Sequence, residues 1–150
     1  MLRLIPLIKS GQRMLQLESI ENAYSFHSYN EHSATLIKPN SLIHSHHSIE
    51  EDLIKISSTT LIYGDTIDTD KLPLSFSDFN EACISKLAQY DADIFLVGTG
   101  SRCQFPDKSI LCSIAKNKLA IDFMDNGAAS RTFNILTSEY RKVAVLLFFK

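Results

Sequence analysis

The last third of the chain, from Asp93 to Lys150, constrains the fold more than any other stretch. It contains three apolar runs (93–97, 119–124 and 143–149), separated by segments of helical periodicity at 106–117 and 127–138. An unbroken apolar run is typical of a parallel strand that is covered on both faces. Successive strand–helix–strand units require right-handed crossovers and parallel pairing. The pattern therefore predicts an α/β fold with a C-terminal parallel βαβαβ unit.

Helices are predicted on both sides of the strand at 93–97. The first opens at Ser75, which with Asp78 makes a weak capping box, and its apolar stripe is Phe79, Cys83, Leu87 and Tyr90. The second begins at Pro106 or Asp107, where a proline costs no hydrogen bond, and Asn117 can end it. Its core stripe is predicted to be Ile110, Leu111, Ile114 and Ala115.

The segment 24–63 predicts an N-terminal antiparallel meander. Alternating or β-branched runs at 24–29, 34–37, 42–48 and 59–63 indicate strands, and the polar turns between them contain Asn30 and Pro39. Within the first run, Tyr24, Phe26 and Ser28 are expected on one face. Residues 50–57 fit either a short helix or an edge strand, and 65–73 is predicted to be a loop.

Composition narrows the class of protein. A chain of 150 residues with 45% hydrophobic residues predicts one globular domain over 1–150. Within it, the patterns along the chain predict an N-terminal arm at 1–20, antiparallel strands at 24–63 and an α/β portion at 75–149. The net charge of −2 gives no pull toward nucleic acid, and no apolar run is long enough for a membrane span. The three cysteines, an odd number without C-x-x-C spacing, predict a reducing compartment. The expected location is the cytoplasm, if the protein is bacterial. The basic, acid-poor start leaves a mitochondrial transit peptide as the alternative.

The glycine turn Gly98-Thr99-Gly100 is the first candidate for chemistry. It follows a predicted buried strand, and Asp125 ends the next strand, which is the arrangement of a dinucleotide site. Cys103 takes the place of the third glycine, and Pro106 delays the next helix. The turn therefore cannot aim helix N–H groups at a phosphate in the usual way, and nucleotide binding is the less favoured interpretation.

The histidines and cysteines are the candidates for metal binding and catalysis. From them we predict no catalytic residue, no metal site and no cofactor. His44 and His46 share a strand face, but two imidazoles do not make a zinc site, so solvated histidines are favoured. Cys103 lies beside Arg102, which would lower a thiol pKa, but no histidine follows His47 to serve as a base. Cys83 and Cys112 fall on predicted helices and are expected to pack.

Charged residues gather on and after the last predicted helix. Arg131 and Asn134 lie three residues apart on one helix face, and Glu139 can pair with Arg131 or Arg141 as a structural ion pair. The alternative is an arginine-lined concavity for an anionic group or an acidic partner. The predicted pocket or partner site comprises Gly98, Thr99, Gly100, Arg102, Asp125, Arg131, Asn134, Glu139 and Arg141.

The same stretch carries a family resemblance. The runs Val97–Ser101, Phe105-Pro106, Met124–Leu136 and Glu139–Ala144 resemble a family of uncharacterised Mth-like domain proteins. That family includes the mitochondrial complex I assembly factor 3 and the adipogenesis-associated Mth-like domain proteins. The resemblance is close over 93–149 and loose over 24–92. Four positions depart from the family pattern: Asn126 replaces threonine, Ser130 cysteine, Phe133 tyrosine, and Tyr140 the glycine of Glu-Gly-Arg.

The resemblance implies a three-layer α/β fold with a mixed central sheet and a role in assembly, without an established enzymatic activity. The first hypothesis is accordingly a non-enzymatic protein that binds membrane or respiratory complex subunits or their assembly factors. The alternative is a small-molecule or nucleotide-binding protein, or an enzyme, with a pocket at the Gly98–Gly100 loop. The loss of cysteine at Ser130 argues against thiol chemistry there.

Overall fold

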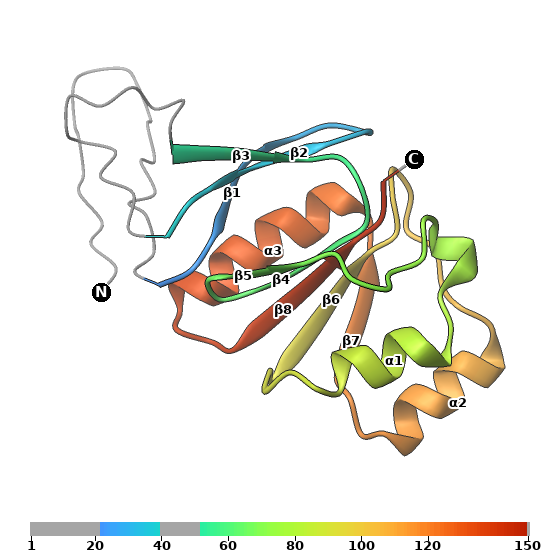
Figure 1. The fold of residues 1–150 in the computed structure, drawn as a ribbon. Helices are drawn as coiled ribbons and strands as arrows, with labels where there is room; N and C mark the ends of the chain where they lie inside the picture. Colours follow the sequence, from blue (N-terminus) through green and yellow to red (C-terminus); the bar gives the residue numbers. More distant parts are fainter. Residues whose placement is uncertain (1–21, 40–51, 150) are drawn as a thin grey trace.

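The computed structural model describes residues 22–39 and 52–149, arranged as two β-sheets and three α-helices (Figure 1). The predicted N-terminal arm at 1–20 and the predicted strand at 42–48 lie outside these residues. The helices are α1 (Glu81–Leu87), α2 (Lys108–Lys116) and α3 (Asn126–Ser138).

The central sheet has five strands in the order β5-β4-β8-β6-β7. Its strands are β4 (Thr60–Tyr63), β5 (Thr66–Asp68), β6 (Ile94–Gly98), β7 (Ile121–Met124) and β8 (Val143–Leu147). β6 pairs in parallel with both β7 and β8, which confirms the predicted C-terminal parallel unit. β4 pairs antiparallel with β8 and with β5, so the sheet is mixed.

The N-terminal strands form a separate antiparallel sheet in the order β1-β2-β3. Its members are β1 (Ser25–Tyr29), β2 (Ala34–Ile37) and β3 (Leu53–Ile56), so the ambiguous segment at 50–57 contributes a strand. β4 was predicted to continue this meander but joins the central sheet instead. Leu61 and Ile62 are both buried, one in each of the two cores that cover the faces of the central sheet.

Two further expectations are corrected. The alternation within β1 is broken by a register shift between Phe26 and Ser28, so that Ser28 does not share the face of the buried Phe26 but is exposed. The predicted loop at 65–73 contains β5, which makes a hairpin with β4 across Gly64 and Asp65. Gly64 has φ +57, the left-handed conformation that glycine adopts without steric cost.

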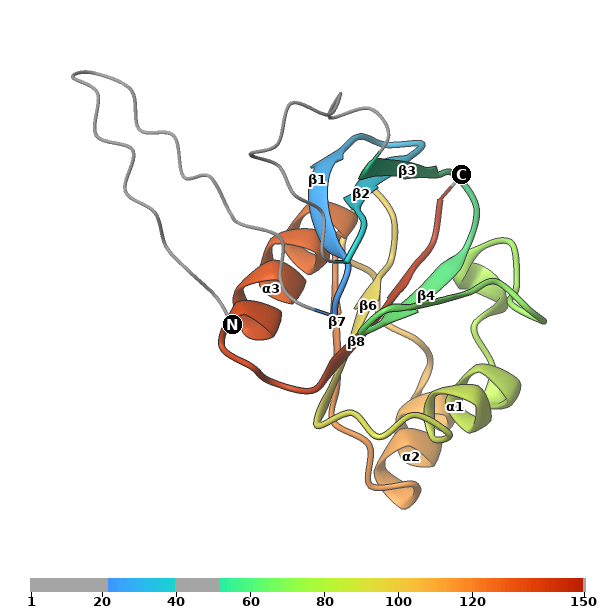
Figure 2. The ribbon, with the colours of Figure 1, turned by 60° about the vertical axis from the view of Figure 1, so that its left-hand side comes forward.

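Three layers result, as the family resemblance implies. α1 and α2 cover one face of the central sheet, while α3 and the three-stranded sheet together cover the other (Figure 2). β8 lies at the middle of the central sheet and is buried on both sides: Ala144 and Leu146 belong to one core, Val145 and Leu147 to the other. The continuous apolar run at 143–149 is explained by this central position.

The helix expected from Ser75 is shorter than predicted. Ser75 makes no capping bond; its Oγ contacts that of Ser77, and Phe76–Asp78 form a single 3-10 turn. α1 begins only after Asn80, whose Oδ1 accepts hydrogen bonds from the N–H groups of Ala82 (2.9 Å) and Cys83 (3.3 Å). Asparagine is among the best N-cap residues, so the true start of the helix lies five residues after the predicted one.

α2 is confirmed in its limits, and two residues of its predicted core stripe, Ile110 and Ile114, are buried. Asp107 caps its N-terminus by accepting from the N–H of Ile110, and Asn117 is its C-cap. Ser113 is buried, whereas Leu111 and Ala115 are exposed. The hydroxyl of Ser113 donates to Glu81 of α1, so the buried face of α2 includes a polar contact between the two helices.

α3 ends in a Schellman motif, in which Tyr140 has φ +60. The N–H of Tyr140 donates to Thr137 O (3.0 Å) and that of Arg141 to Leu136 O (3.0 Å). Glycine is the usual residue at this position because a Cβ disfavours the left-handed conformation by about 1–2 kcal/mol. We expect Tyr140→Gly to be about 1 kcal/mol more stable than Tyr140→Ala in urea unfolding. Equal stability of the two variants, which both lack the ring, would contradict backbone strain at this residue.

A polar network at β5 predicts alkaline sensitivity. Tyr90 donates to Asp68 Oδ2 (2.7 Å), and Lys86 pairs with Asp68 Oδ1 (2.9 Å). Burial, the hydrogen bond and the charge of Asp68 raise the pKa of Tyr90 from 10.0 to about 12. Since the pKa is raised in the folded state, this contribution to stability is complete below pH 10 and is lost as the pH rises toward 12. We expect Tyr90→Phe to lessen the fall in unfolding free energy between these pH values; parallel profiles of variant and parent would refute this.

Candidate functional site

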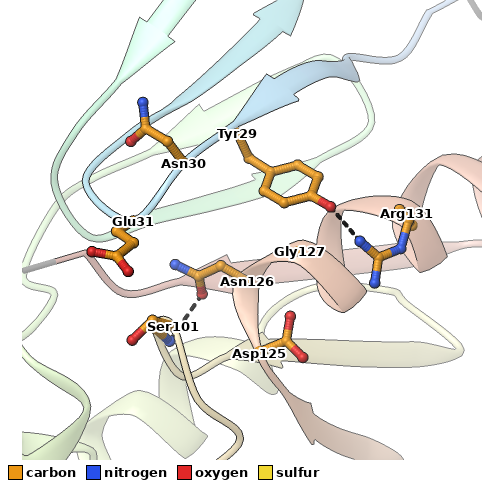
Figure 3. A pocket seen from close by; sticks show the side chains of 9 residues that line it. Tyr29, Asn30, Glu31, Ser101, Asp125, Asn126, Gly127 and Arg131 are labelled. Atoms are coloured by element: carbon orange, nitrogen blue, oxygen red, sulfur yellow. Dashed lines mark hydrogen bonds between the residues drawn. The ribbon is translucent and has the colours of Figure 1, made fainter.

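A solvent-open hollow lies between the β1–β2 hairpin and the N-terminus of α3 (Figure 3). Its volume is about 280 Å³. We call it the hairpin hollow. It is lined by Tyr29, Asn30, Glu31, Gly100, Ser101, Asp125, Asn126, Gly127 and Arg131.

The turn between β1 and β2 forms one wall of the hairpin hollow. Asn30 Oδ1 accepts hydrogen bonds from the N–H groups of His32 (2.8 Å) and Ser33 (2.9 Å), and Asn30 N–H donates to Ser33 O (2.8 Å). Such an Asx turn fixes the backbone locally. Glu31 lies inside this turn and also lines the hollow (Figure 3).

The loop after β6 forms the opposite wall. Gly100 has φ +106 and lines the hollow. Gly98 is buried beneath it, and a Cβ there would lie 2.3 Å from Leu147 Cδ2 and 2.4 Å from Asn126 Oδ1. Thr99 is also buried; its Oγ1 donates to Arg102 O (2.6 Å) and accepts from Gln104 N–H (2.9 Å). The glycine turn is therefore required by packing and by the course of the loop.

Asn126 joins the wall formed by the loop after β6 to the residue that follows β8. Its Oδ1 accepts from the N–H of Gly100 (3.0 Å), and its Nδ2 donates to Phe148 O (2.8 Å). Its own N–H donates to Gly100 O (2.8 Å). Asn126 is only 4% exposed, so its side-chain amide is largely shielded from water. These hydrogen bonds give the buried amide the partners that water would otherwise provide.

Asp125 and Arg131 contribute opposite charges from α3. Asp125 is the N-cap, accepting from the N–H of Ala128 (2.9 Å). Arg131 donates to the hydroxyl of Tyr29, and its guanidinium carbon lies 5.8 Å from the centre of the Tyr29 ring. A Cβ on Gly127 would lie 2.7 Å from this ring, so glycine lets the hairpin approach the helix.

Three of the nine predicted site residues line the hairpin hollow: Gly100, Asp125 and Arg131. Gly98 and Thr99 lie below its wall, and Arg102 is exposed outside the lining. Glu139 and Arg141 follow the C-terminus of α3, about 12 Å or more along the helix from Arg131, the lining residue nearest to them in the chain. The expected ion pair of Glu139 with Arg131 or Arg141 does not form.

Asn134 has a structural role that its sequence position did not indicate. Its Oδ1 accepts from Phe26 N–H (2.7 Å) and its Nδ2 donates to Phe26 O (2.9 Å). The amide thus pairs with the edge of β1 as a neighbouring strand would. Phe26 and Phe133 meet edge to face beside it, with ring centres 5.5 Å apart. Together these contacts dock the hairpin on α3.

The remaining lining residues were not predicted: Tyr29, Asn30, Glu31, Ser101, Asn126 and Gly127. In the sequence, the turn residues are recognisable only as a polar turn. Asn126 and Gly127 belong to the motif that carries the family resemblance. Nothing local in the sequence links the hairpin to a helix about a hundred residues later.

Metal and thiol chemistry have little support in residues 22–39 and 52–149. They contain no group of three or more histidine, cysteine or acidic side chains that could hold a metal ion, and His44, His46 and His47 lie outside them. Burial raises the pKa of the Cys83 thiol, as expected for a packing residue. Cys112 was expected to pack but is exposed, because it lies off the buried face of α2.

Comparison with known proteins places these features in a family. Residues 27–148 match a family model described as a protein of unknown function (DUF498/DUF598). A relative from Francisella tularensis subsp. holarctica (strain LVS), named a 13 kDa major membrane protein, is 28% identical over 95 residues, which cover 63% of this chain and 72% of the relative.

Solved structures share the fold. An NMR structure of a Xanthomonas campestris protein has a TM-score of 0.66 and 22% identity, covering 89% of this chain and 90% of that one. A Mth938-like domain from Bordetella pertussis has a TM-score of 0.63 and 17% identity, covering 90% and 91%. The expected Mth-like fold is thereby confirmed. None of the helices in the described residues has the length and apolar character to cross a membrane.

Proposed function

The chain belongs to the DUF498/DUF598 family of proteins of unknown function. We propose that it is a non-enzymatic binding protein whose hairpin hollow holds a protein partner. The proposal rests on one observation: the polar side chains of the lining already form hydrogen bonds within the protein. Asp125 caps α3, Asn126 holds the β6 loop, and Arg131 holds Tyr29. These groups maintain the shape of a surface rather than surround a reacting atom.

The lining also lacks the pairing that nucleophilic catalysis uses. It contains neither histidine nor cysteine, and its Ser101 hydroxyl has no hydrogen bond to a base in the described part of the chain. An activated nucleophile needs a base within about 2.6–3.2 Å. The volume of about 280 Å³ also falls just below the usual range for small-molecule sites, about 300–1,000 Å³. Both features favour an open contact surface.

The proposed partner is a subunit of a membrane complex or one of its assembly factors. The Francisella relative is named a membrane protein, and the family resemblance implies an assembly role, with respiratory complex I as one instance. We place this function in the cytoplasm of a bacterial cell, with a mitochondrial location as the alternative.

Site-specific photocrosslinking tests the proposal. Ser101 lines the hairpin hollow, and Ser85 is an exposed serine of α1 on the opposite face of the central sheet. A photoreactive residue at position 101 is expected to capture a membrane-complex subunit or assembly factor in cells. The same residue at position 85 should not. Absence of adducts, or the same adducts from both positions, would refute partner binding at the hollow.

A small-molecule ligand is the second candidate, favoured by the presence of three charged residues, Glu31, Asp125 and Arg131, in the lining of one hollow. A thermal-shift screen of nucleotides, flavins and acidic metabolites tests it. A ligand at a hundred times its dissociation constant should add about 2.7 kcal/mol to the unfolding free energy. No shift across the panel would eliminate these classes.

A further inference from the structure

We infer that the chain forms a two-fold dimer in which β7 pairs antiparallel with β7 of a second copy, so that the two central sheets join into one. The interface lies at the outer edge of the central sheet and not in the hairpin hollow, so it goes beyond the proposed function and does not depend on it. Three features of this edge support the dimer: free backbone groups, exposed apolar side chains beside them, and a pattern that is complementary to itself.

β7 is an outermost strand of the central sheet, and only one side of its backbone is bonded. The carbonyl groups of Ala120 and Met124 accept hydrogen bonds from β6 and from the residue after it (2.8 and 2.9 Å). Because successive residues of a strand direct their backbone groups to opposite sides, those of Ile121 and Phe123 point away from β6. With the residues that the structure describes, the N–H and C=O of Ile121 and the N–H of Phe123 form no hydrogen bond.

α2 leaves apolar side chains exposed on the flank that faces past this edge. The opposite flank carries Ser113, which donates to α1. α1 lies on the β5 side of the sheet, where its Lys86 pairs with Asp68 (Figure 2). Residues two positions from Ser113 lie about 200° away around the helix, so Leu111 and Ala115 face past β7. Both are exposed, although the sequence predicted them in the core.

Phe105 adds an exposed aromatic ring at the end of the same edge. The ring is 69% exposed, and its centre lies 6.2 Å from that of Phe123. Aromatic side chains are enriched in protein interfaces, where they bury a large apolar area. The ring, the α2 flank and the free side of β7 therefore form one continuous surface that a second strand with its own helix can cover.

The other outer strands of the described sheets are better protected. β1 is bonded through the backbone of Phe26 to the amide of Asn134. β5 has three residues, and the ion pair of Lys86 with Asp68 lies at its end. β3 carries the exposed Lys55, and lysine on an edge strand discourages pairing. Among the described strands, β7 is the one that combines free backbone groups with exposed apolar side chains.

β7 is complementary to itself when Ile121 lies opposite Ile121 of the second copy. The two residues then exchange N–H···O bonds, and the Phe123 N–H of each copy meets the Leu119 O of the other. The two remaining groups of that pair already have partners: Phe123 O accepts from Cys103 Sγ (3.5 Å), and Leu119 N–H donates to Ile114 O (3.3 Å). Each free group therefore meets a free group, and a partner of different sequence would have to match this pattern by chance.

The charge of Asp122 selects this register. Asp122 is exposed and here lies opposite Ala120 of the second copy. A shift of two residues would place Asp122 opposite itself, and like charges directly opposite destabilise a strand pair. On the other face, Leu119, Ile121 and Phe123 pack against the core beneath α1 and α2, and are only partly buried in one copy. Pairing extends this apolar row across the junction.

Sedimentation equilibrium of the full chain, with a reductant to keep its thiols reduced, tests the dimer. We expect the mass to approach that of two copies as the concentration rises. Leu111→Lys places a charge in the apolar part of the interface and should raise the dissociation constant roughly tenfold or more. Ser85→Lys is the matched control, because Ser85 is an exposed residue of α1 and lies away from the β7 edge; its dissociation constant should not change. Neither substitution disturbs the core, since both side chains are exposed.

Amide hydrogen exchange tests the strand pairing itself. The N–H groups of Ile121 and Phe123 point away from β6, so they should exchange quickly at low protein concentration and slowly when the dimer forms. Leu111→Lys should remove this concentration-dependent protection, and Ser85→Lys should keep it. Asp122 N–H faces β6 in either state and serves as the internal reference.

A chain that remains monomeric at millimolar concentration would overturn the dimer. So would a dimer in which Ile121 and Phe123 stay unprotected, or one that both lysine variants weaken equally, because another surface would then join the copies. The proposed function is judged separately, by crosslinking from Ser101 in the hairpin hollow. Its success in the Leu111→Lys variant, or its failure in a chain that dimerises as described, tells the two proposals apart.

Discussion

Replacing Asn126 with alanine is expected to lower the unfolding free energy by about 2–4 kcal/mol. The change removes the hydrogen bonds from Gly100 N–H and to Phe148 O, and leaves these backbone groups in a site that is 4% exposed in the parent. Each buried group left unsatisfied costs about 1–3 kcal/mol. Urea unfolding measures the loss. Amide exchange should also accelerate at Gly100 and Ser101, because the wall of the hairpin hollow has lost its attachment to α3.

Asn117→Ala provides the matched control. Asn117 is an exposed C-cap whose side chain donates to Ser113 O (2.8 Å), so water can replace its hydrogen bond. We expect a loss below about 1 kcal/mol at this position. If Asn126→Ala were no more harmful than Asn117→Ala, the role assigned to Asn126 would be wrong.

Phe133→Ala should be the most destabilising single change, with a loss of about 3–5 kcal/mol. Phe133 is completely buried and lies in the core shared by α3, the hairpin and the central sheet. Its ring meets that of Phe26 edge to face, and Asn134 beside it holds Phe26 by its backbone. Unfolding in urea gives the energy. Weaker docking of the hairpin should also reduce crosslinking from position 101.

Phe105→Ala is the control for aromatic truncation. Phe105 also makes an edge contact, with Phe123, but is 69% exposed. Little area is lost from the core, so a change below about 1 kcal/mol is expected. Similar losses at positions 105 and 133 would mean that the core around α3 adapts to the missing ring.

Much of the C-terminal half was predictable because its signals are local. Asp107 and Asn117 bracket α2, and the apolar runs at 93–97 and 143–149 mark strands covered on both faces. Where local signals competed, prediction failed. Ser75 resembles a cap, but Asn80 makes the cap bonds. In α2, Ile110 and Ile114 are buried as predicted, but the third buried residue is Ser113, which donates to Glu81, and Leu111 and Ala115 are exposed.

The candidate site was less predictable than the fold. Residues with the right chemistry for a site, Gly98, Thr99 and Asn134, serve packing, loop geometry and strand pairing. Asn30 and Glu31 form a wall of the hairpin hollow, although in the sequence they indicate only an ordinary polar turn. Residue type indicates which bonds a side chain can form, but not which neighbour will use them.

By itself, the sequence determined the parallel C-terminal unit, the antiparallel N-terminal strands and the family, because apolar periodicity and motif spacing are read along the chain. Only the tertiary structure decided that β4 leaves the hairpin sheet and that Tyr29 reaches Arg131, 102 residues later. These contacts depend on how the two hydrophobic cores pack against the two faces of the central sheet. Burial on both faces draws β4 to β8, and the packing of Phe26 on Phe133 sets the position of the hairpin and so the shape of the hollow.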